Sequence, residues 1–305
     1  YFQTVPKAAL DSILFLESDR MGHLLGAVTQ EKLDNQIGVV QNEKRQGDNQ
    51  PYGMVDYAQT AALFPADHPY GHQTIGSMSD LTGATLEDVK NWFRQHYGPN
   101  NAVLVLAGDI DVATAKPLVQ KYFGDIARGP QQKAVEAPVP TLPAPKSDVM
   151  KDRVATVRLY RTWTLPGMAD PDAVPLDIGG TVLGGLSSSR LDNILVRQEK
   201  LAVGVSAGTY SFAQMGMFEI TVNVRPGVDP DKVSARLDQI VADFVKTGPT
   251  ADEVNRAVTR EISGRIAGLE SVGGFGGKAV ALAEGALYMK DSGFYKKNLK
   301  AFAAA

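Results

Sequence analysis

The first 125 residues of the chain carry apolar residues mainly at helical spacing. After Thr29, a suitable N-cap, Leu33, Ile37 and Val40 fall at i, i+4 and i+7, which is the stripe of an amphipathic helix. Glycine and proline in residues 47–51 mark its end. The same periodicity predicts helices over residues 6–25, 29–47, 54–64, 86–97 and 112–123.

The patterns beyond residue 150 alternate between strand and helix. They predict strands over residues 155–163, 203–211 and 217–224, and helices over 174–183, 231–246, 251–268 and 278–289. In the first half, the apolar run 102–108 predicts a buried strand, and residues 1–5 are typical of the end of another strand. The paired adjacent strands after residue 203 argue against a parallel, nucleotide-binding sheet.

Four prolines fall within the eight residues Pro138–Pro145. Such a segment is extended and semi-rigid, so it marks a boundary between domains. We therefore expect an N-terminal domain over residues 1–137, a proline-rich linker over 138–150 and a C-terminal domain over 151–305. A chain of 305 residues is long enough for about two domains with separate cores.

Composition and charge narrow the classes of function. The formal net charge is −3, which gives no basic footprint, so nucleic acid is not expected as a partner. No apolar run approaches the roughly 20 residues of a membrane-spanning helix, and we expect no membrane insertion. The chain has no cysteine, which excludes disulfides, cysteine-ligated zinc and a thiol nucleophile.

Three groups of residues are candidates for chemistry. Glu43 shares one side of its helix with Gln36, since seven residues make two turns with about 20° of drift. By itself, a glutamate followed by two basic residues is typical of a solvated helix face. His68 and His72 have a proline and a glycine between them, so a packed, hydrogen-bonded loop is favoured over a zinc-binding helix. The glycine-rich loop Gly184–Ser189 lacks a P-loop lysine, so it is a weak candidate for phosphate binding.

Three segments of the chain resemble motifs of one enzyme family. Val39–Gln46 is similar to the VVxNExRQ segment of the M16 (pitrilysin and insulinase-like) zinc peptidases, most closely of the bacterial M16B type. Tyr97–Asp109 resembles the family's YxPNNAxLxxxGD block, and Gly184–Leu191 resembles its GGxxSSRL turn. The resemblance implies an α+β fold of two tandem M16-type (LuxS/MPP-like) domains, each an antiparallel sheet with helices packed on one face.

The resemblance implies that Glu43 is the third ligand of a catalytic zinc ion. The family's other two ligands are histidines of an inverted His-x-x-Glu-His motif, whose glutamate is the general base, and we expect that motif upstream of Tyr1. Two of the three protein ligands of Zn²⁺ would then lie outside the chain, so we expect the chain alone to be inactive and to bind zinc weakly. Gln36 stands where family members often carry a supporting glutamate, and an amide cannot take up a proton.

A second departure from the family pattern concerns substrate binding. In active M16 enzymes, an arginine and a tyrosine of one C-terminal domain reach the zinc site and hold the peptide and the developing oxyanion. Arg197 matches the arginine, whereas Val203 takes the place of the tyrosine. The chain therefore resembles the metal-bearing half. We expect a second M16 half, on another subunit or further along the same gene product, to supply the pair. From the residues alone, Arg197 is equally well explained as an ordinary helix-end salt bridge.

The activity implied by the resemblance is zinc-dependent endopeptidase action on peptides or small unfolded proteins, enclosed in a chamber between two halves. The alternative is a non-catalytic structural or regulatory M16-like subunit. An intact or a degraded histidine motif upstream of Tyr1 would distinguish the two. By the same resemblance, a bacterial periplasmic or secreted location is suspected, and a cytoplasmic one stays open.

Overall fold

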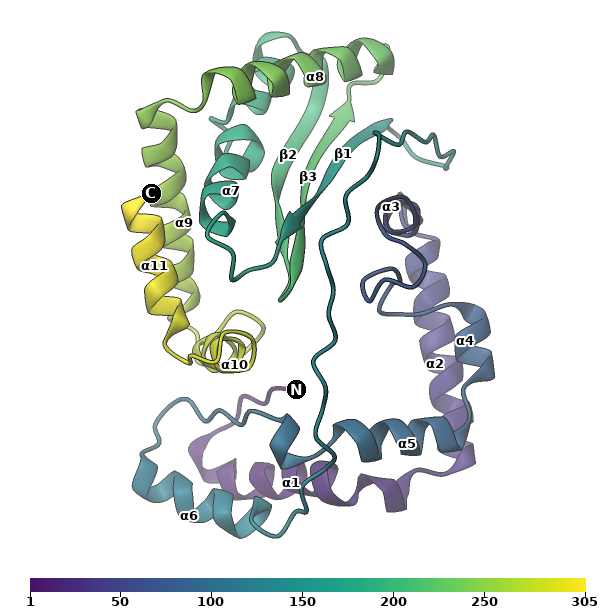
Figure 1. Cartoon of the computed structure of the whole chain (residues 1–305), viewed down its shortest axis with the longest axis vertical. Coiled ribbons are helices and arrows are strands. Elements are labelled where there is room, and N and C mark those ends of the chain that lie inside the picture. The colour runs from purple at the N-terminus through teal and green to yellow at the C-terminus, as the bar shows by residue number, and fades with distance from the viewer. The chain divides into compact units, whose positions relative to one another are not determined.

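The computed structural model describes all residues from Tyr1 to Ala305 (Figure 1). The chain divides into two compact units. The first consists of Tyr1–Asp48, Thr74–Val135 and Arg265–Lys297, and the second consists of Asn49–Gln73, Glu136–Gly264 and Asn298–Ala305. Each unit is therefore discontinuous in the sequence. The proline-rich residues 138–150 form neither helix nor strand.

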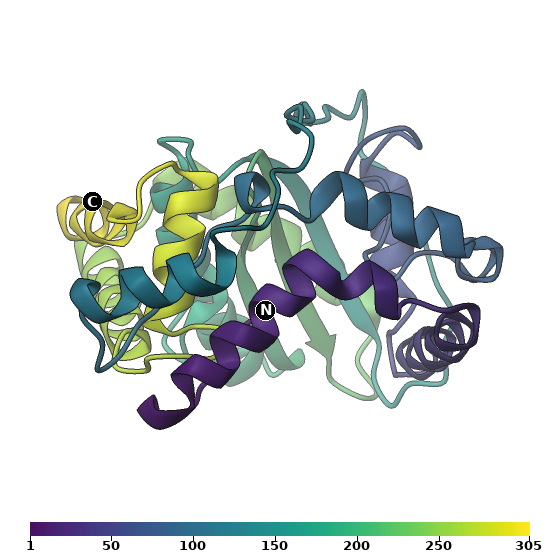
Figure 2. The same cartoon turned by 90° about the horizontal axis from the view of Figure 1, so that it is seen from below.

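The first unit is helical. Its elements are η1 (Lys7–Ala9), α1 (Leu10–Ala27), α2 (Gln30–Asp48), α4 (Met78–Gly83), α5 (Leu86–His96), η2 (Pro99–Asn101), α6 (Val112–Phe123) and α10 (Lys278–Tyr288). Helix α1 packs against α6, a pair that Figure 2 shows from below, and α2 packs against α4. The five helices predicted in this unit are confirmed to within a few residues, whereas the short helix α4 was not predicted.

Side-chain caps determine where several of these helices begin. Thr29 Oγ1 accepts a hydrogen bond from Lys32 N at 3.3 Å, which confirms the predicted N-cap of α2. Helix α5 begins with a capping box, in which Thr85 accepts from the backbone of Asp88 and the Asp88 carboxylate accepts from the backbone of Thr85. Ser77 and Asp80 form the same arrangement at the start of α4.

Residues 102–108 do not form the buried strand that their apolar run predicts. They contain no strand, and the side chains of Val103 and Leu104 are 41% and 46% exposed. A strand needs a neighbouring strand to satisfy its backbone groups, and the only sheet of the chain lies among residues 158–224. Residues 1–5 contain no strand either, so that expectation was also wrong.

The second unit contains a three-stranded sheet. Its strands are β1 (Arg158–Pro166), β2 (Ala202–Ser211) and β3 (Met215–Val224), in the order β1-β3-β2, and both pairs are antiparallel. Thr221 in the central strand lies opposite Tyr160 of β1 and opposite Ser206 of β2. Together with the helices, this sheet confirms the predicted α+β class and contradicts the parallel, nucleotide-binding alternative.

Most helices of the second unit cover one face of this sheet. The helical elements of the unit are α3 (Val55–Leu63), α7 (Ala173–Gly180), η3 (Thr181–Gly185), η4 (Asp192–Gln198) and α8 (Pro230–Thr247). Residues 251–264 of α9 (Ala251–Gly268) and residues 298–304 of α11 (Phe294–Ala304) also belong to it. The fully buried Ile220 and Val222 of β3 pack in one apolar cluster with Val233 and Leu237 of α8. Burial of such side chains, at about 1.5–3 kcal/mol each, holds the helix layer on the sheet.

Two glycines allow the helix layer to approach β2 closely. A Cβ atom on Gly180 would lie 2.9 Å from the Cα of Gly208, and one on Gly184 would lie 2.6 Å from the backbone nitrogen of Ala207. Both distances are shorter than van der Waals contact, so a larger residue at either position would push the helix away from the strand. Gly184 opens the GGLSSSRL segment, and this packing is one reason for its glycine.

The opposite face of the sheet is polar. Alternate residues place Arg158, Tyr160 and Thr162 of β1 beside Glu219 and other polar residues of β3. Helix α3 lies on this side, opposite α7 (Figure 1). None of the helices of the chain has the length and apolar composition that a membrane span requires.

Candidate functional site

Helix α2 presents Glu43 and Gln36 on one exposed side. Leu33 and Lys44 are buried on the inner side of the helix, whereas Gln36, Val39 and Glu43 are exposed. Positions 36, 39 and 43 follow i, i+3 and i+7, so their side chains stack along the helix axis. The structure therefore brings Gln36 and Glu43 to one surface, as their spacing predicts.

The Glu43 carboxylate is free to bind a cation. It is exposed and makes no hydrogen bond or ion pair with the rest of the chain. The neighbouring Lys44 points to the buried side, where its Nζ lies 3.2 Å from Asp48 Oδ2. Because that cation already has a carboxylate partner, it does not compete for Glu43.

The residues of the chain do not form a complete zinc site by themselves. No group of three or more His, Asp or Glu side chains is placed to hold a metal ion. A catalytic zinc ion needs three protein ligands and one open position. Glu43 thus fits zinc only as a single oxygen donor within a larger ligand set.

The loop histidine His68 is a structural residue. It is buried, its Nε2 lies 2.8 Å from the carbonyl oxygen of Pro138, and its Nδ1 accepts a hydrogen bond from Tyr70 N at 3.1 Å. Both ring nitrogens are therefore occupied, which leaves no lone pair for a metal. The packed, hydrogen-bonded loop that the sequence predicts is confirmed.

Arg197 belongs to the second unit, where it is the second-last residue of the π-helical segment η4. Its Nε donates to Asp192 Oδ1 at 2.7 Å, and its side chain is 57% exposed. The Val203 side chain lies on β2 and is 48% exposed. Since the Asp192 carboxylate accepts from Nε and the side chain is largely exposed, the ion pair does not prevent Arg197 from binding a further acceptor. Its role in substrate binding stays a prediction.

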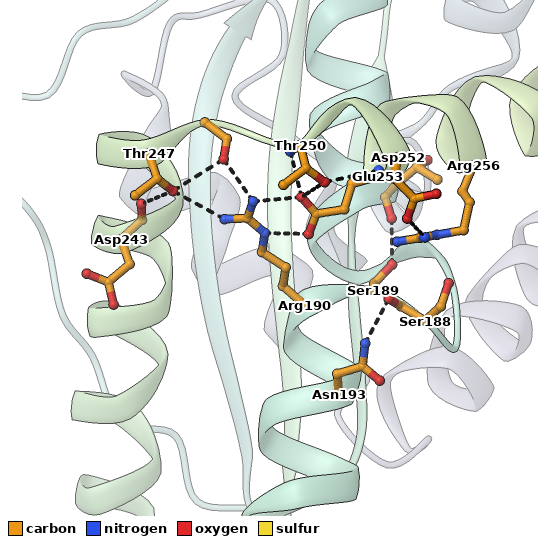
Figure 3. A network of polar contacts seen from close by, with 12 residues as sticks. Ser188, Ser189, Arg190, Asn193, Asp243, Thr247, Thr250, Asp252, Glu253 and Arg256 are labelled. Carbon is orange, nitrogen blue, oxygen red and sulfur yellow. Dashed lines mark hydrogen bonds and ion pairs between the residues drawn. The ribbon is translucent and has the colours of Figure 1, made fainter.

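The GGLSSSRL turn is anchored by a polar network within the second unit (Figure 3). Arg190 reaches Glu253 at the start of α9 with two hydrogen bonds, Nε to Oε1 at 2.6 Å and Nη2 to Oε2 at 2.7 Å. Ser189 Oγ donates to Thr181 O at 2.6 Å and accepts from Leu186 N at 2.9 Å. The polar groups of the turn are thus directed at the protein itself.

The Arg190–Glu253 pair also shifts the ionisation of both groups. The hydrogen bonds from Arg190 are the largest effect on Glu253 and lower its pKa to about 2, against the opposing effect of burial. The hydrogen bonds to Glu253 raise the pKa of Arg190 in turn. The pair therefore stays ionised over the whole range in which proteins work, as expected of a structural anchor.

Sequence reasoning did not identify a cavity of about 410 Å³ on the polar face of the sheet. It is lined by Tyr52 and Asp56 from the start of the α3 region, and by Arg158, Tyr160 and Glu219 from the strands. The available signal was the unusual polarity of alternate strand positions. It could not be interpreted before the strand register was known, because these residues are far apart in the chain.

A comparison with protein families gives a match over more than half of the chain. Residues 83–261 match the model described as "Peptidase M16 inactive domain". The chain is also 27% identical over 279 residues to the zinc protease PqqE of Helicobacter pylori. That alignment covers 89% of this chain and 61% of the relative, so the chain spans less than two thirds of its length.

Solved structures show the same fold. A protease from Helicobacter pylori superposes with a TM-score of 0.82 at 25% identity, over 99% of this chain and 72% of that one. A peptidase M16 inactive domain from Pseudomonas fluorescens gives a TM-score of 0.80 at 19% identity, over 96% of this chain and 68% of that one. The second likeness is evidence for the fold alone.

Proposed function

Because the chain belongs to the peptidase M16 family, we propose that it forms part of a zinc-dependent endopeptidase that cleaves peptides or small unfolded proteins. The observation that supports this most directly is Glu43. It lies within the VVQNEKRQ segment of α2 as an exposed carboxylate without an ion-pair partner. The relatives whose names include zinc protease support the same class of chemistry.

In this proposal, Glu43 supplies one of three protein ligands. Zinc, when bound, lowers the pKa of its water ligand to about 7 and polarises a carbonyl group. Gln36 lies on the same side of α2 and can hydrogen-bond but cannot accept a proton, so it orients neighbouring groups and does not act as a base. The two remaining ligands, both histidines, would come from outside residues 1–305.

A second M16 half completes the proposed site. Val203 has no hydroxyl to stabilise a developing oxyanion, so the arginine–tyrosine pair must come from another half. The peptide would be enclosed between the two halves during cleavage. Arg197 would then contact the peptide through its guanidinium, which suits carbonyl and carboxylate oxygens.

A non-catalytic M16 subunit is the second candidate. It is favoured by the description of the matched domain as inactive. In that case the complete protein would have a degraded histidine motif and would bind no zinc. Its contribution would be structural, as a scaffold for an active half.

Cleavage of an internally quenched peptide by the complete protein tests the proposal. We expect cleavage when a second M16 half carrying the pair is present, loss of cleavage with a chelator, and recovery when zinc is added back. Cleavage by a homodimer of the M16 half to which this chain belongs, with no other M16 half present, would contradict the role of the second half. Absence of cleavage under all conditions, with no bound zinc, would favour the non-catalytic subunit.

A further inference from the structure

The cavity on the polar face of the sheet lies entirely within the second unit. Alternate residues of the strands form its floor, and the residues before and at the start of α3 form its wall. The residues that determine its chemistry are Tyr52, Asp56, Arg158, Tyr160, Glu219 and Asn223. Neither the zinc proposal nor the family motifs account for this group.

Arg158 is held in place by neutral groups only. Its Nε donates to Asn223 Oδ1 at 2.8 Å, and its Nη1 donates to the Tyr160 hydroxyl at 3.3 Å. The carbon of its guanidinium lies 3.6 Å from the centroid of the Tyr52 ring. No carboxylate of the chain pairs with it, so Nη2 and one N–H of Nη1 remain available as a planar fork for an anion.

Tyr52 is fixed in an unusual conformation above this arginine. Its φ angle is 64°, in the left-handed region that bulky side chains rarely occupy. Its backbone N–H donates to Asp152 Oδ2 at 3.0 Å, and its hydroxyl donates to Thr156 O at 2.7 Å. These contacts maintain the strained conformation and orient the ring, so the guanidinium is positioned before a ligand arrives. Backbone strain of this kind is concentrated at ligand sites.

The other end of the cavity is negatively charged. The half-buried Glu219 carboxylate accepts hydrogen bonds from Gln59 Nε2 at 2.7 Å and Thr221 Oγ1 at 3.2 Å, which are neutral donors. Asp56 is exposed and pairs with no cation. Burial raises the pKa of Tyr210, and the charges of Glu219 and Asp56 raise it further, so their field extends across the cavity.

The strand register separates the two charged ends. Asn223 lies opposite Arg158, and Glu219 is four residues earlier on the same side of β3, so the backbone positions of Asn223 and Glu219 are about 13 Å apart at about 3.3 Å per residue. An extended peptide of three or four residues covers a similar distance. The volume of about 410 Å³ lies in the range of sites for small ligands.

We propose that this cavity binds a short peptide with both termini free, with its carboxylate on Arg158 and its ammonium group facing Glu219 and Asp56. A ligand with one charge would leave the opposite end of the cavity uncompensated, whereas a zwitterion of this length compensates both ends. The proposal rests on the proposed peptidase function for the source of the ligand, because short peptides with free termini are what an endopeptidase releases.

Calorimetric titration with small peptides tests the site without any cleavage. The complete protein, with a chelator present, is titrated with tetra-alanine, with its C-terminal amide and with its N-acetylated form. The variants are Arg158→Gln and Glu219→Gln. Arg153→Gln is the matched control, because Arg153 is an exposed arginine of the same unit that lies outside the cavity.

We expect the free peptide to bind, and the loss of a charge-assisted contact to weaken binding by about tenfold or more. At the Arg158 end, we expect this loss for the C-terminal amide and for the Arg158→Gln variant. At the Glu219 end, we expect it for the N-acetylated peptide and for the Glu219→Gln variant. The Arg153→Gln variant should bind as the wild type does.

Equal affinity of the wild type for the free peptide and its amide would overturn the proposal, even if a variant failed to fold. Unchanged binding by a folded Arg158→Gln variant would overturn it as well. Since the chelator abolishes zinc chemistry, a protein that binds the peptide but never cleaves a substrate would contradict only the proposed function. A protein that cleaves but does not bind tetra-alanine would contradict only this site.

Discussion

Arg190 and Glu253 form a two-pronged ion pair in which both side chains are mostly buried, at 20% and 17% exposure. The pair joins the GGLSSSRL turn to the first turn of α9 (Figure 3). Glu253 also accepts hydrogen bonds from the backbone N–H and the hydroxyl of Thr250, so it caps the helix at the same time. One carboxylate thus fixes both a turn and a helix start.

Removal of the arginine should destabilise the protein. We expect Arg190→Ala to lower the free energy of unfolding by about 2 kcal/mol, because it leaves the Glu253 carboxylate poorly solvated and without its main partner. Arg256→Ala is the control, since Arg256 pairs with Asp252 on the exposed surface of the same helix and should change stability by about 0.5 kcal/mol or less. Urea unfolding followed by circular dichroism measures both. Equal effects of the two substitutions would contradict the anchoring role.

The same pair predicts how stability depends on pH. The pKa of Glu253 is about 2 in the folded protein and about 4.3 in the unfolded chain. Its stabilising contribution is therefore complete above about pH 5 and is lost as the pH falls towards 2. The Glu253→Gln variant should lose less stability over this acid range than the wild type does. The free energy of unfolding of both proteins is measured by urea unfolding at each pH. If it falls equally with pH in the two proteins, the Arg190–Glu253 pair is not the cause of the acid destabilisation.

Arg197 should affect catalysis more than folding. Its ion pair with Asp192 is exposed, so we expect Arg197→Ala to change the free energy of unfolding by about 0.5 kcal/mol or less. In the complete protein, assembled with a second M16 half, the same substitution should raise KM for a peptide about tenfold, because it removes a charge-assisted contact. Arg256→Ala, which removes a similar exposed pair, should leave KM unchanged. An equal KM for both variants would mean that Arg197 forms only its salt bridge with Asp192 and does not bind the peptide.

Local patterns were sufficient to predict most helices. Helix α2 has its apolar stripe and its Thr29 cap within 20 consecutive residues, so nothing distant was needed, although the helix runs through Gly47 to Asp48. The six-residue helix α4 was missed although Ser77 and Asp80 show the spacing of a capping box. Its length leaves too few residues for a periodic signal, and the cap alone carries the information.

Features that depend on distant segments could not be predicted. The apolar run 102–108 suggests a strand, but a strand forms only beside a partner, and no strand of the chain pairs with it. The cavity was missed for a related reason, since Tyr52, Arg158 and Glu219 meet only through the sheet register. Glu43 is predicted as a zinc ligand because its motif is contiguous, whereas its isolated sequence context indicates a surface charge, which its exposure in the structure also allows.

Metal analysis of the complete protein is the measurement that tests the central claim most directly. Glu43→Gln is compared with Glu31→Gln, which changes another exposed glutamate of the same helix. We expect about one zinc ion per chain in the wild type and in Glu31→Gln, and loss of zinc in a folded Glu43→Gln variant, because the amide is a weak zinc ligand. Full zinc content in Glu43→Gln, or no zinc in the wild type, would contradict the assignment of this chain to the metal-bearing half.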